Sequence, residues 1–302
     1  METILITGAT GLIGQEIVAQ CHQQGYRVNY LTTSKSKLSK SKNYNGFYWN
    51  PKENEIDTNC FYEVKTIINL VGATVSKRWT QSYKKEITES RTNTAKLLLE
   101  TIKSNKFEVE HIISASAIGI YPSSLDILYD EAHTDASSSF LGQVVSVWEA
   151  AVDEFKSIGV KVSKVRIGLV LSEKGGALPE IIKPMKLGAG AAFGSGEQWQ
   201  SWVHVQDLAR LFLFIKENKL EGIYNGVAPN PVTNTELTKV AAKVLKKPLI
   251  LPNIPKFAMK LALGEMHTIL FQSQRVNAEK IIKAGFVFEF PNLKPALQEL
   301  LN

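Results

Sequence analysis

The fold is indicated most strongly by residues 3–25, which read TILITGATGLIGQEIVAQCHQQG. Residues 3–7 are apolar or β-branched, as in a short buried strand, and residues 12–24 place Ile13, Ile17 and Cys21 on one face of a helix that Gly25 ends. A strand that passes directly through a glycine-punctuated turn into a helix predicts the first unit of a dinucleotide-binding fold.

Each glycine of the turn has a physical task. Gly8 permits the tight turn, Gly11 lets backbone N–H groups approach a pyrophosphate, and Gly14 lets the helix pack closely on the sheet. The helix also directs the positive end of its dipole toward the phosphates. We therefore expect a nicotinamide dinucleotide at this turn, in contact with Gly8, Ala9, Thr10, Gly11, Leu12, Ile13 and Gly14.

The end of the second strand, Arg27–Leu31, indicates which dinucleotide is preferred. An Asp or Glu at this place would accept hydrogen bonds from the ribose 2′-hydroxyl of NAD, but the sequence has Thr32, Thr33, Ser34 and Lys35. No carboxylate repels a 2′-phosphate here, and the hydroxyls and the lysine can bind one. We predict NADP(H), with NAD as the weaker ligand. The nearby run of Lys35, Lys37, Lys40 and Lys42 has a simpler alternative explanation as a solvated loop.

Strand and helix patterns alternate through the first half of the chain. Further strands are predicted at Thr66–Val71, His111–Ala115 and Lys161–Leu171, and helices at Gln81–Ser104 and Phe140–Ile158. This alternation predicts an α/β fold with a Rossmann-type, doubly wound parallel sheet.

The character of the chain changes after Leu171. Six glycines lie within residues 175–196, which we do not expect to form regular core, and they indicate the crossing into a smaller C-terminal substrate lobe. Later patterns predict a helix at Val205–Lys216, a strand at Gly222–Gly226, and helices at Glu236–Leu245, Pro255–Leu263 and Asn277–Ala284. We predict a dinucleotide-binding domain of residues 1–171, to which 203–228 return, and a smaller lobe of residues 172–202 and 229–302.

Composition argues against several classes of protein. The net charge is +6 but the lysines are dispersed, so we do not expect nucleic-acid binding. The two cysteines, Cys21 and Cys60, form no Cys-x-x-Cys pair and the five histidines are scattered, so we expect a reducing compartment and no metal. Neither a signal-peptide pattern nor an apolar segment of roughly 20 residues is present, which predicts a soluble, cytoplasmic protein without a membrane partner.

Several motifs resemble the extended short-chain dehydrogenase/reductase superfamily. Asn69-Leu70-Val71-Gly72 resembles the fourth-strand segment beneath the cofactor, which implies cofactor contacts at Leu70, Val71 and Gly72. Asn93 sits where that group's central helix carries an Asn, and Trp202–Asp207 resembles its return motif. More narrowly, the chain is similar to an atypical branch of sugar-nucleotide epimerase family proteins with a distinct C-terminal domain. The matching segments are Arg78-Trp79, Ser90-Arg91, Ser114–Gly119, Trp148-Glu149, Gly194–Trp199, Pro229–Asn234 and Leu263–Met266.

The resemblance also identifies departures at the expected reaction centre. Extended members use a Tyr-x-x-x-Lys pair as the acid/base, but alignment through Glu149 places Leu141 and Val145 at those positions. Leu and Val cannot move a proton. The remaining catalytic candidates are Ser116, Tyr121 and Arg78. For each there is an alternative: Ser116 caps a turn, Tyr121 packs near the cofactor, and Arg78 pairs with Glu86 or Glu89.

A second departure concerns the substrate. Relatives that bind nucleoside-diphosphate sugars carry an arginine two residues before the aromatic that Trp202 resembles, and this chain has Gln200 there. A neutral amide loses the charge-assisted contact to a diphosphate. We expect a different small molecule, in a pocket of Gln198, Trp199, Gln200 and Trp202, unless the tryptophans fill the seam between the lobes.

Two functional hypotheses follow. The first is an NADP-dependent epimerase or reductase that acts on a small hydroxyl- or carbonyl-bearing substrate. The second is a non-catalytic protein that senses the NADP/NADPH ratio and passes that state to a protein partner, as loss of the acid/base pair would allow. The sequence leaves the oligomeric state open, a homodimer included.

Overall fold

A largely parallel sheet forms the centre of the protein in the computed structural model, which describes residues 2–301. Its strand order is β13-β9-β7-β6-β1-β2-β4-β3, with β5 (Glu55–Ile56) also paired to β4, and all neighbours are parallel except the short β3 (Lys40–Ser41) and β5. The parallel strands are β1 (Thr3–Thr7), β2 (Arg27–Thr32), β4 (Tyr44–Asn50), β6 (Val64–Asn69), β7 (His111–Ala117), β9 (Lys161–Ile167) and β13 (Gly222–Gly226).

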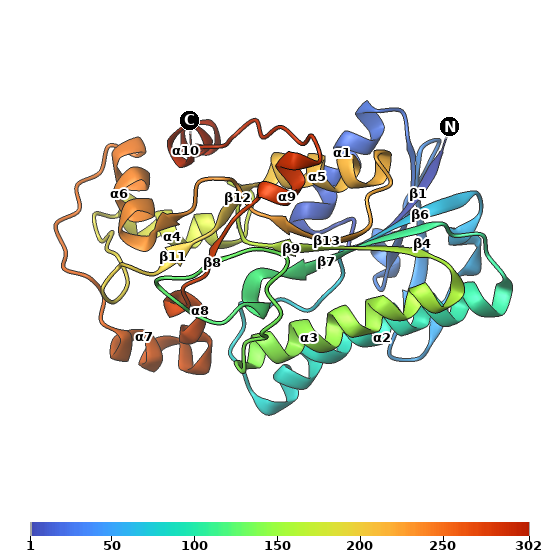
Figure 1. The fold of residues 1–302 in the computed structure, drawn as a ribbon, viewed down its shortest axis with the longest axis horizontal. Coiled ribbons are helices and arrows are strands. Elements are labelled where there is room, and N and C mark those ends of the chain that lie inside the picture. Colours follow the sequence, from blue (N-terminus) through green and yellow to red (C-terminus); the bar gives the residue numbers. More distant parts are fainter. Residues whose placement is uncertain (1, 302) are drawn as a thin grey trace.

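Helices cover both faces of this sheet. α1 (Leu12–Gln23) and α5 (Val205–Glu217) pack together on one face, while α2 (Gln81–Asn105) and α3 (Phe140–Asp153) pack together on the other (Figure 1). All five residues of β1 are buried, as a strand covered from both sides requires. The predicted fold class, a doubly wound Rossmann-type sheet, is confirmed.

The strand order reverses at β1, whose neighbours β2 and β6 lead the chain outward in opposite directions. Ligands of open α/β sheets bind at the carboxyl ends of the strands at such a reversal. There, the Thr7 hydroxyl donates to Asn69 Oδ1 (2.7 Å), and Asn69 Nδ2 donates to Ser114 Oγ (3.1 Å). These bonds join the carboxyl ends of β1, β6 and β7 and fix the floor of the crevice.

A second hydrophobic cluster lies in the C-terminal half of the chain. It is built from α4 (Ala177–Lys186), α6 (Asn234–Val244) and α10 (Leu293–Leu301), together with Trp202. In Figure 1 these helices and α7 (Lys256–Leu263) lie on the left, away from β1 and β4. The boundaries predicted for the two lobes stay a prediction.

Two sequence-based expectations are wrong. Lys161–Leu171 is not one strand, because it breaks at Gly168, where a Cβ would lie 2.1 Å from the Ser201 carbonyl oxygen. The glycine-rich stretch contains regular core after all, since Leu178, Ile182 and Met185 of α4 are buried in the second cluster. Neither β4 nor α10 was expected from the sequence.

Short elements complete the described chain. No helix among residues 2–301 is long and apolar enough to span a membrane. The remaining strands and helices are β3 (Lys40–Ser41), β5 (Glu55–Ile56), β8 (Leu128–Tyr129), β10 (Leu169–Leu171), β11 (Trp199–Gln200), β12 (Trp202–His204), β14 (Val232–Thr233), β15 (Arg275–Val276), α8 (Thr268–Phe271) and α9 (Glu279–Lys283), with 3-10 turns at Lys35–Lys37, Thr58–Phe61, Ile118–Ile120, Glu154–Ile158 and Gly264–His267.

Candidate functional site

The glycine turn between β1 and α1 is closely packed. Gly8 has a φ of +74°, a backbone conformation that favours glycine, and its carbonyl oxygen accepts a hydrogen bond from Gly11 N (3.0 Å). A Cβ at Gly14 would lie 2.2 Å from the Gly8 carbonyl oxygen and 2.7 Å from Ala9 Cα. Only glycine at position 14 therefore lets α1 start this close to the turn.

The start of α1 is open to an anion. Gly11 occupies the N-cap and supplies no side-chain cap, and the first turn of this fully described helix contains no acidic residue. Gly11 itself is exposed, and Gly8 and Thr10 are partly exposed. Uncapped amide groups at a helix N-terminus favour a bound phosphate. The residues therefore fit the pyrophosphate of a dinucleotide.

The segment after β2 carries hydroxyl groups and a lysine on the protein surface. Thr32 is buried, and its Oγ1 accepts a hydrogen bond from Ser34 N (3.2 Å). Thr33 and Lys35 are exposed, and Lys35 Nζ lies 5.2 Å from the centre of the Tyr48 ring. This combination suits a phosphate monoester beside the second strand.

The segment after β6 is hydrogen-bonded to β1 on one side and to α2 on the other. The backbone N–H groups of Leu70 and Val71 donate to Thr7 Oγ1, over 3.1 and 3.4 Å. A Cβ at Gly72 would lie 2.8 Å from Cζ of Arg91, so the glycine makes room for this guanidinium. Arg91 Nη1 donates to the carbonyl oxygens of Ala73 and Ile87, and burial lowers the pKa of Arg91 to about 10. The resemblance did not assign this role to Gly72.

Ser116 and Tyr121 belong to a buried polar network. Ser116 Oγ donates to Glu149 Oε1 (2.6 Å), and the Tyr121 hydroxyl donates to Asn225 Oδ1 (2.8 Å) while accepting from Arg166 Nη1 (3.1 Å). Ser116 is only 3% exposed and Tyr121 is 0% exposed. Both hydroxyls are thus engaged inside the protein, where they do not reach an open surface.

Glu149 and Arg166 form the centre of this network. Arg166 Nε and Nη2 donate to the two carboxylate oxygens of Glu149, over 2.9 and 3.0 Å. Burial alone would raise the pKa of Glu149, but the hydrogen bonds and charge of Arg166 outweigh burial and hold that pKa below its ordinary value. Glu149 therefore stays ionised and is a structural partner of Arg166.

Leu141, at the usual position of the catalytic tyrosine, lies in an apolar cluster. Leu141 packs with Trp79, Ile87 and Val144, and Met266 and Ile269 from the C-terminal part cover the same cluster. Val145, at the usual lysine position, is buried in the main core. No described side chain at these two positions can transfer a proton.

Arg78 lies beside the C-terminal part of the chain. It is exposed, and a Cβ at Gly264 would lie 3.6 Å from its Nε. In the described residues it forms no ion pair with Glu86 or Glu89, and Glu89 instead pairs with Lys85 (3.6 Å). Arg78 is thus the one catalytic candidate whose charge is presented to solvent.

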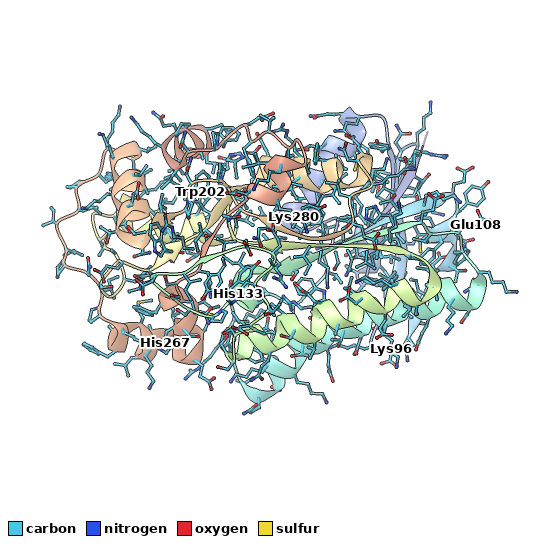
Figure 2. The ribbon with its side chains drawn as sticks, in the orientation of Figure 1. Lys96, Glu108, His133, Trp202, His267 and Lys280 are labelled. Carbon is cyan, nitrogen blue, oxygen red and sulfur yellow. The ribbon has the colours of Figure 1, made fainter. Side chains whose placement is uncertain are left out.

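The four residues expected to line the substrate pocket differ in their exposure. Trp202 is 0% exposed, and its indole N–H donates to the Asn230 carbonyl oxygen within the second cluster, in the lobe where Figure 2 labels it. Gln198 is buried and donates to two backbone carbonyl oxygens. Trp202 and Gln198 therefore hold this lobe together, while Trp199 and Gln200 remain partly exposed.

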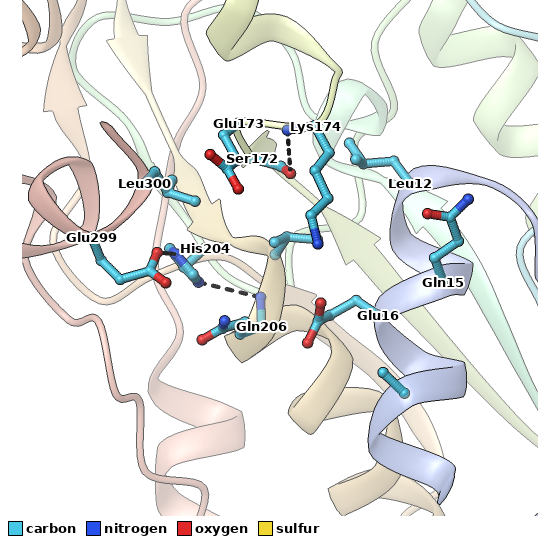
Figure 3. A pocket seen from close by; sticks show the side chains of 12 residues that line it. Leu12, Gln15, Glu16, Ser172, Glu173, Lys174, His204, Gln206, Glu299 and Leu300 are labelled. Carbon is cyan, nitrogen blue, oxygen red and sulfur yellow. Dashed lines mark hydrogen bonds and ion pairs between the residues drawn. The ribbon is translucent and has the colours of Figure 1, made fainter. Parts of the chain in front are cut away.

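A small hollow of about 140 Å³ lies beside the start of α1 (Figure 3). His204 is fixed at its edge, where Nδ1 accepts from Gln206 N (3.3 Å) and Nε2 lies 2.9 Å from Glu299 Oε2. Glu16, Glu173 and Glu299 line the hollow with Lys174 as the only lysine. This excess of carboxylates disfavours a phosphate there, so the dinucleotide is better matched by the open side of the glycine turn.

Comparison with known proteins gives the family. Residues 4–226 match the model of the NAD dependent epimerase/dehydratase family. The chain belongs to this epimerase/dehydratase family. Residues 254–300 match a second model, described as a domain of unknown function (DUF1731). The resemblance to an atypical epimerase branch with its own C-terminal domain is thereby confirmed.

Curated relatives of this epimerase/dehydratase chain share its full length. It is 34% identical over 305 residues to an epimerase family protein of Staphylococcus aureus, and 34% identical over 307 residues to one of Staphylococcus haemolyticus, with 100% of each chain covered.

Solved structures of epimerase family proteins also match. A human epimerase family protein, solved with NADPH, has a TM-score of 0.84 and 26% identity, over 99% of this chain and 98% of that one. A nucleoside-diphosphate sugar epimerase from Corynebacterium glutamicum has a TM-score of 0.77 and 26% identity, over 99% of this chain and 58% of that one. The family is described as NAD dependent and the human neighbour was solved with NADPH, so the prediction of a nicotinamide dinucleotide cofactor is confirmed at the level of the family.

Proposed function

We propose that the chain is an NADP(H)-dependent epimerase or reductase that acts on a small hydroxyl- or carbonyl-bearing substrate. The observation that carries this proposal is the uncapped glycine turn at the strand reversal, followed after β2 by hydroxyls and Lys35 instead of a carboxylate. The human neighbour solved with NADPH supports the choice of NADP(H).

In this proposal, three segments of the chain bind the cofactor and Arg78 acts on the substrate. Gly8–Gly14 hold the pyrophosphate, Thr32–Lys35 the 2′-phosphate, and Leu70–Gly72 the segment beneath the nicotinamide half. The bound cofactor supplies hydride transfer. Arg78, exposed at the edge of the C-terminal part, stabilises an oxyanion on the substrate, and Ser116 and Tyr121 position the end of β7 through their buried bonds.

The cofactor part is tested by a charge reversal. Lys35→Glu removes the cation and places a carboxylate where it would repel a 2′-phosphate, so the ratio of NADPH to NADH affinity should fall by at least about tenfold. Lys42→Glu changes the net charge equally in the turn between β3 and β4 and serves as the matched control. Equal effects of the two variants, or a wild type that prefers NADH, would reject NADP(H) as the cofactor.

A second candidate function is non-catalytic sensing of the NADP/NADPH ratio. It is favoured by the apolar packing of Leu141 and Val145 and by the burial of Ser116 and Tyr121. A screen of hydroxyl and carbonyl compounds that yields no turnover, while NADPH still binds tightly, would favour this candidate. Recovery of a protein partner that differs between the oxidised and reduced cofactor would support it further.

A further inference from the structure

Arg275 in β15 carries a guanidinium that has neither a hydrogen-bond acceptor nor a counter-ion in the described part of the chain. Among residues 2–301 no carboxylate forms an ion pair with it and no group accepts a hydrogen bond from it, and its Nε is buried. Asp126 and Asp130, which flank the paired strand β8 in the sequence, form no ion pair with Arg275. A partly buried guanidinium with no acceptor carries a desolvation cost that a bound anion would offset.

The guanidinium of Arg275 lies over the ring of Trp199. Cζ of Arg275 lies 4.4 Å from the centre of the Trp199 ring. The indole is fixed in turn, because its N–H donates to the Leu125 carbonyl oxygen (2.9 Å) and its backbone N–H donates to Ser273 Oγ (3.1 Å). Stacking on an aromatic ring leaves the edge of a guanidinium free for bidentate contact with an oxyanion.

The place of this pair in the fold points to a ligand between the two parts of the chain. The segment that contains Leu125 follows β7 of the main sheet, Trp199 lies in β11, and Ser273 joins the two by donating to the Ser124 carbonyl oxygen (2.7 Å). The neighbouring position Gln200 is where sugar-nucleotide relatives carry an arginine. Arg275 thus brings a positive charge, from a different strand, against the ring of Trp199, the residue next to Gln200 in the chain.

Exposed apolar side chains lie beside Arg275 and Trp199, and they form the rim of this site. Leu125, Ile127 and Leu128 are 49%, 46% and 48% exposed, and Leu128 is the register partner of Arg275 across β8 and β15. Three large apolar side chains exposed within four residues indicate a surface that contacts apolar material. Beside a free guanidinium, such a rim matches a small molecule with an oxyanion on an apolar body.

We propose that Arg275, stacked on Trp199, is an oxyanion-binding subsite for the substrate, taking a carboxylate or a phosphate group. Assigning that group to the substrate rests on the proposed function, whereas the anion site itself does not.

The first test is a chemical footprint of the wild-type protein. Phenylglyoxal modifies accessible arginines, and the modification of the Arg275 peptide is followed by mass spectrometry with pyrophosphate or succinate present. We expect either probe to slow the modification of Arg275 at least about threefold, while the modification of a reference arginine stays constant. Arg210, which pairs with Asp207 (2.8 Å) and Glu289 (3.3 Å), is the internal reference.

The second test compares dissociation constants of the same probes. Arg275→Gln should weaken binding at least about tenfold, and Arg275→Lys should weaken it partially because the charge remains but the planar fork is lost. Lys96→Gln, on α2, is the control of equal net charge, and Figure 2 shows Lys96 far from the lobe that contains Trp202. Circular dichroism establishes that each variant is folded, and the footprint needs no variant.

The outcomes separate the subsite from the cofactor proposal. Pyrophosphate protection alone assigns a phosphate, and succinate protection alone assigns a carboxylate. The subsite is rejected if neither probe protects Arg275, if Arg275→Gln and Lys96→Gln bind alike, or if saturating NADPH displaces the probe, since the cofactor site would then hold it. In the first two cases, unchanged NADPH binding leaves the proposed cofactor function intact.

Discussion

Arg166 donates hydrogen bonds of 2.9 and 3.0 Å, from Nε and Nη2, to the two carboxylate oxygens of Glu149. Lys164 adds a second cation 3.6 Å from the same carboxylate, and Ser116 donates to it as well. The network ties α3 to β7 and β9 below the crevice and keeps the strand ends in a fixed arrangement.

Removing the carboxylate should destabilise the fold strongly. Glu149→Gln leaves the buried charge of Arg166 without its partner, and we expect a loss of about 3 kcal/mol or more in the free energy of unfolding, measured with urea. Because Arg166 depresses the pKa of Glu149 in the folded state, this stabilisation is present at neutral pH and is lost on acidification below the ordinary Glu range. Wild type and variant should therefore converge in acid, and parallel pH profiles would contradict the assignment.

Tyr121→Phe separates a positioning role from proton transfer. The variant removes the hydroxyl that bonds to Asn225 and Arg166, so we expect a loss of about 1–3 kcal/mol in stability. Once a substrate is known, the pH profile of kcat should keep its shape, since the buried hydroxyl does not exchange a proton with substrate. Loss of one limb of that profile, with stability unchanged, would instead make Tyr121 the acid/base.

His111 should make stability depend on pH in a defined window. Burial, followed by the charge of Lys161, lowers the pKa of His111 from 6.5 to about 4. The unfolded chain therefore binds a proton first as the pH falls, and the folded state loses up to about 3 kcal/mol between the two values. His111→Gln lacks this titration, so urea unfolding of wild type should lose stability relative to the variant over that window. A constant difference would show that the histidine titrates normally.

The third glycine of the turn should be essential for cofactor binding. Gly14→Ala places a Cβ 2.2 Å from the Gly8 carbonyl oxygen, so α1 or the turn must move. We expect NADPH affinity to fall at least about tenfold. For stability, Gly119→Ala is the matched control, because its Cβ would lie 3.7 Å from Leu141 in ordinary contact. Similar melting temperatures for the two variants would contradict the close packing assigned to Gly14.

Local signals account for the parts of the fold that the sequence predicts well. β1 and α1 are neighbours in the chain, and their apolar periods and glycines need no distant partner to be interpreted. β4 was missed because its residues, YNGFYWN, do not alternate simply, and Gly46 is required by the Tyr30 ring, which a Cβ there would approach to 2.5 Å. The break at Gly168 likewise depends on Ser201, which is distant in sequence.

The buried network was missed for the same reason. Ser116 and Tyr121 were identified as polar residues at a strand end, but their partners Glu149, Arg166 and Asn225 come from α3, β9 and β13. One signal was present: Lys164 and Arg166 are two residues apart in a strand that reads KVSKVRI, which places both cations on one face of β9 and indicates partners there. The free guanidinium of Arg275 gives no comparable signal in the sequence, because its lack of a partner is visible only in the folded chain.

The most direct test of the account is a calorimetric titration of the purified wild-type protein with NADPH, repeated with NADH and with Gly14→Ala. The glycine turn and the segment after β2 predict saturable binding at one site per chain, weaker binding of NADH, and strong weakening by the substitution. No heat with either nucleotide, or equal binding by wild type and Gly14→Ala, would contradict the claim that this turn holds the dinucleotide.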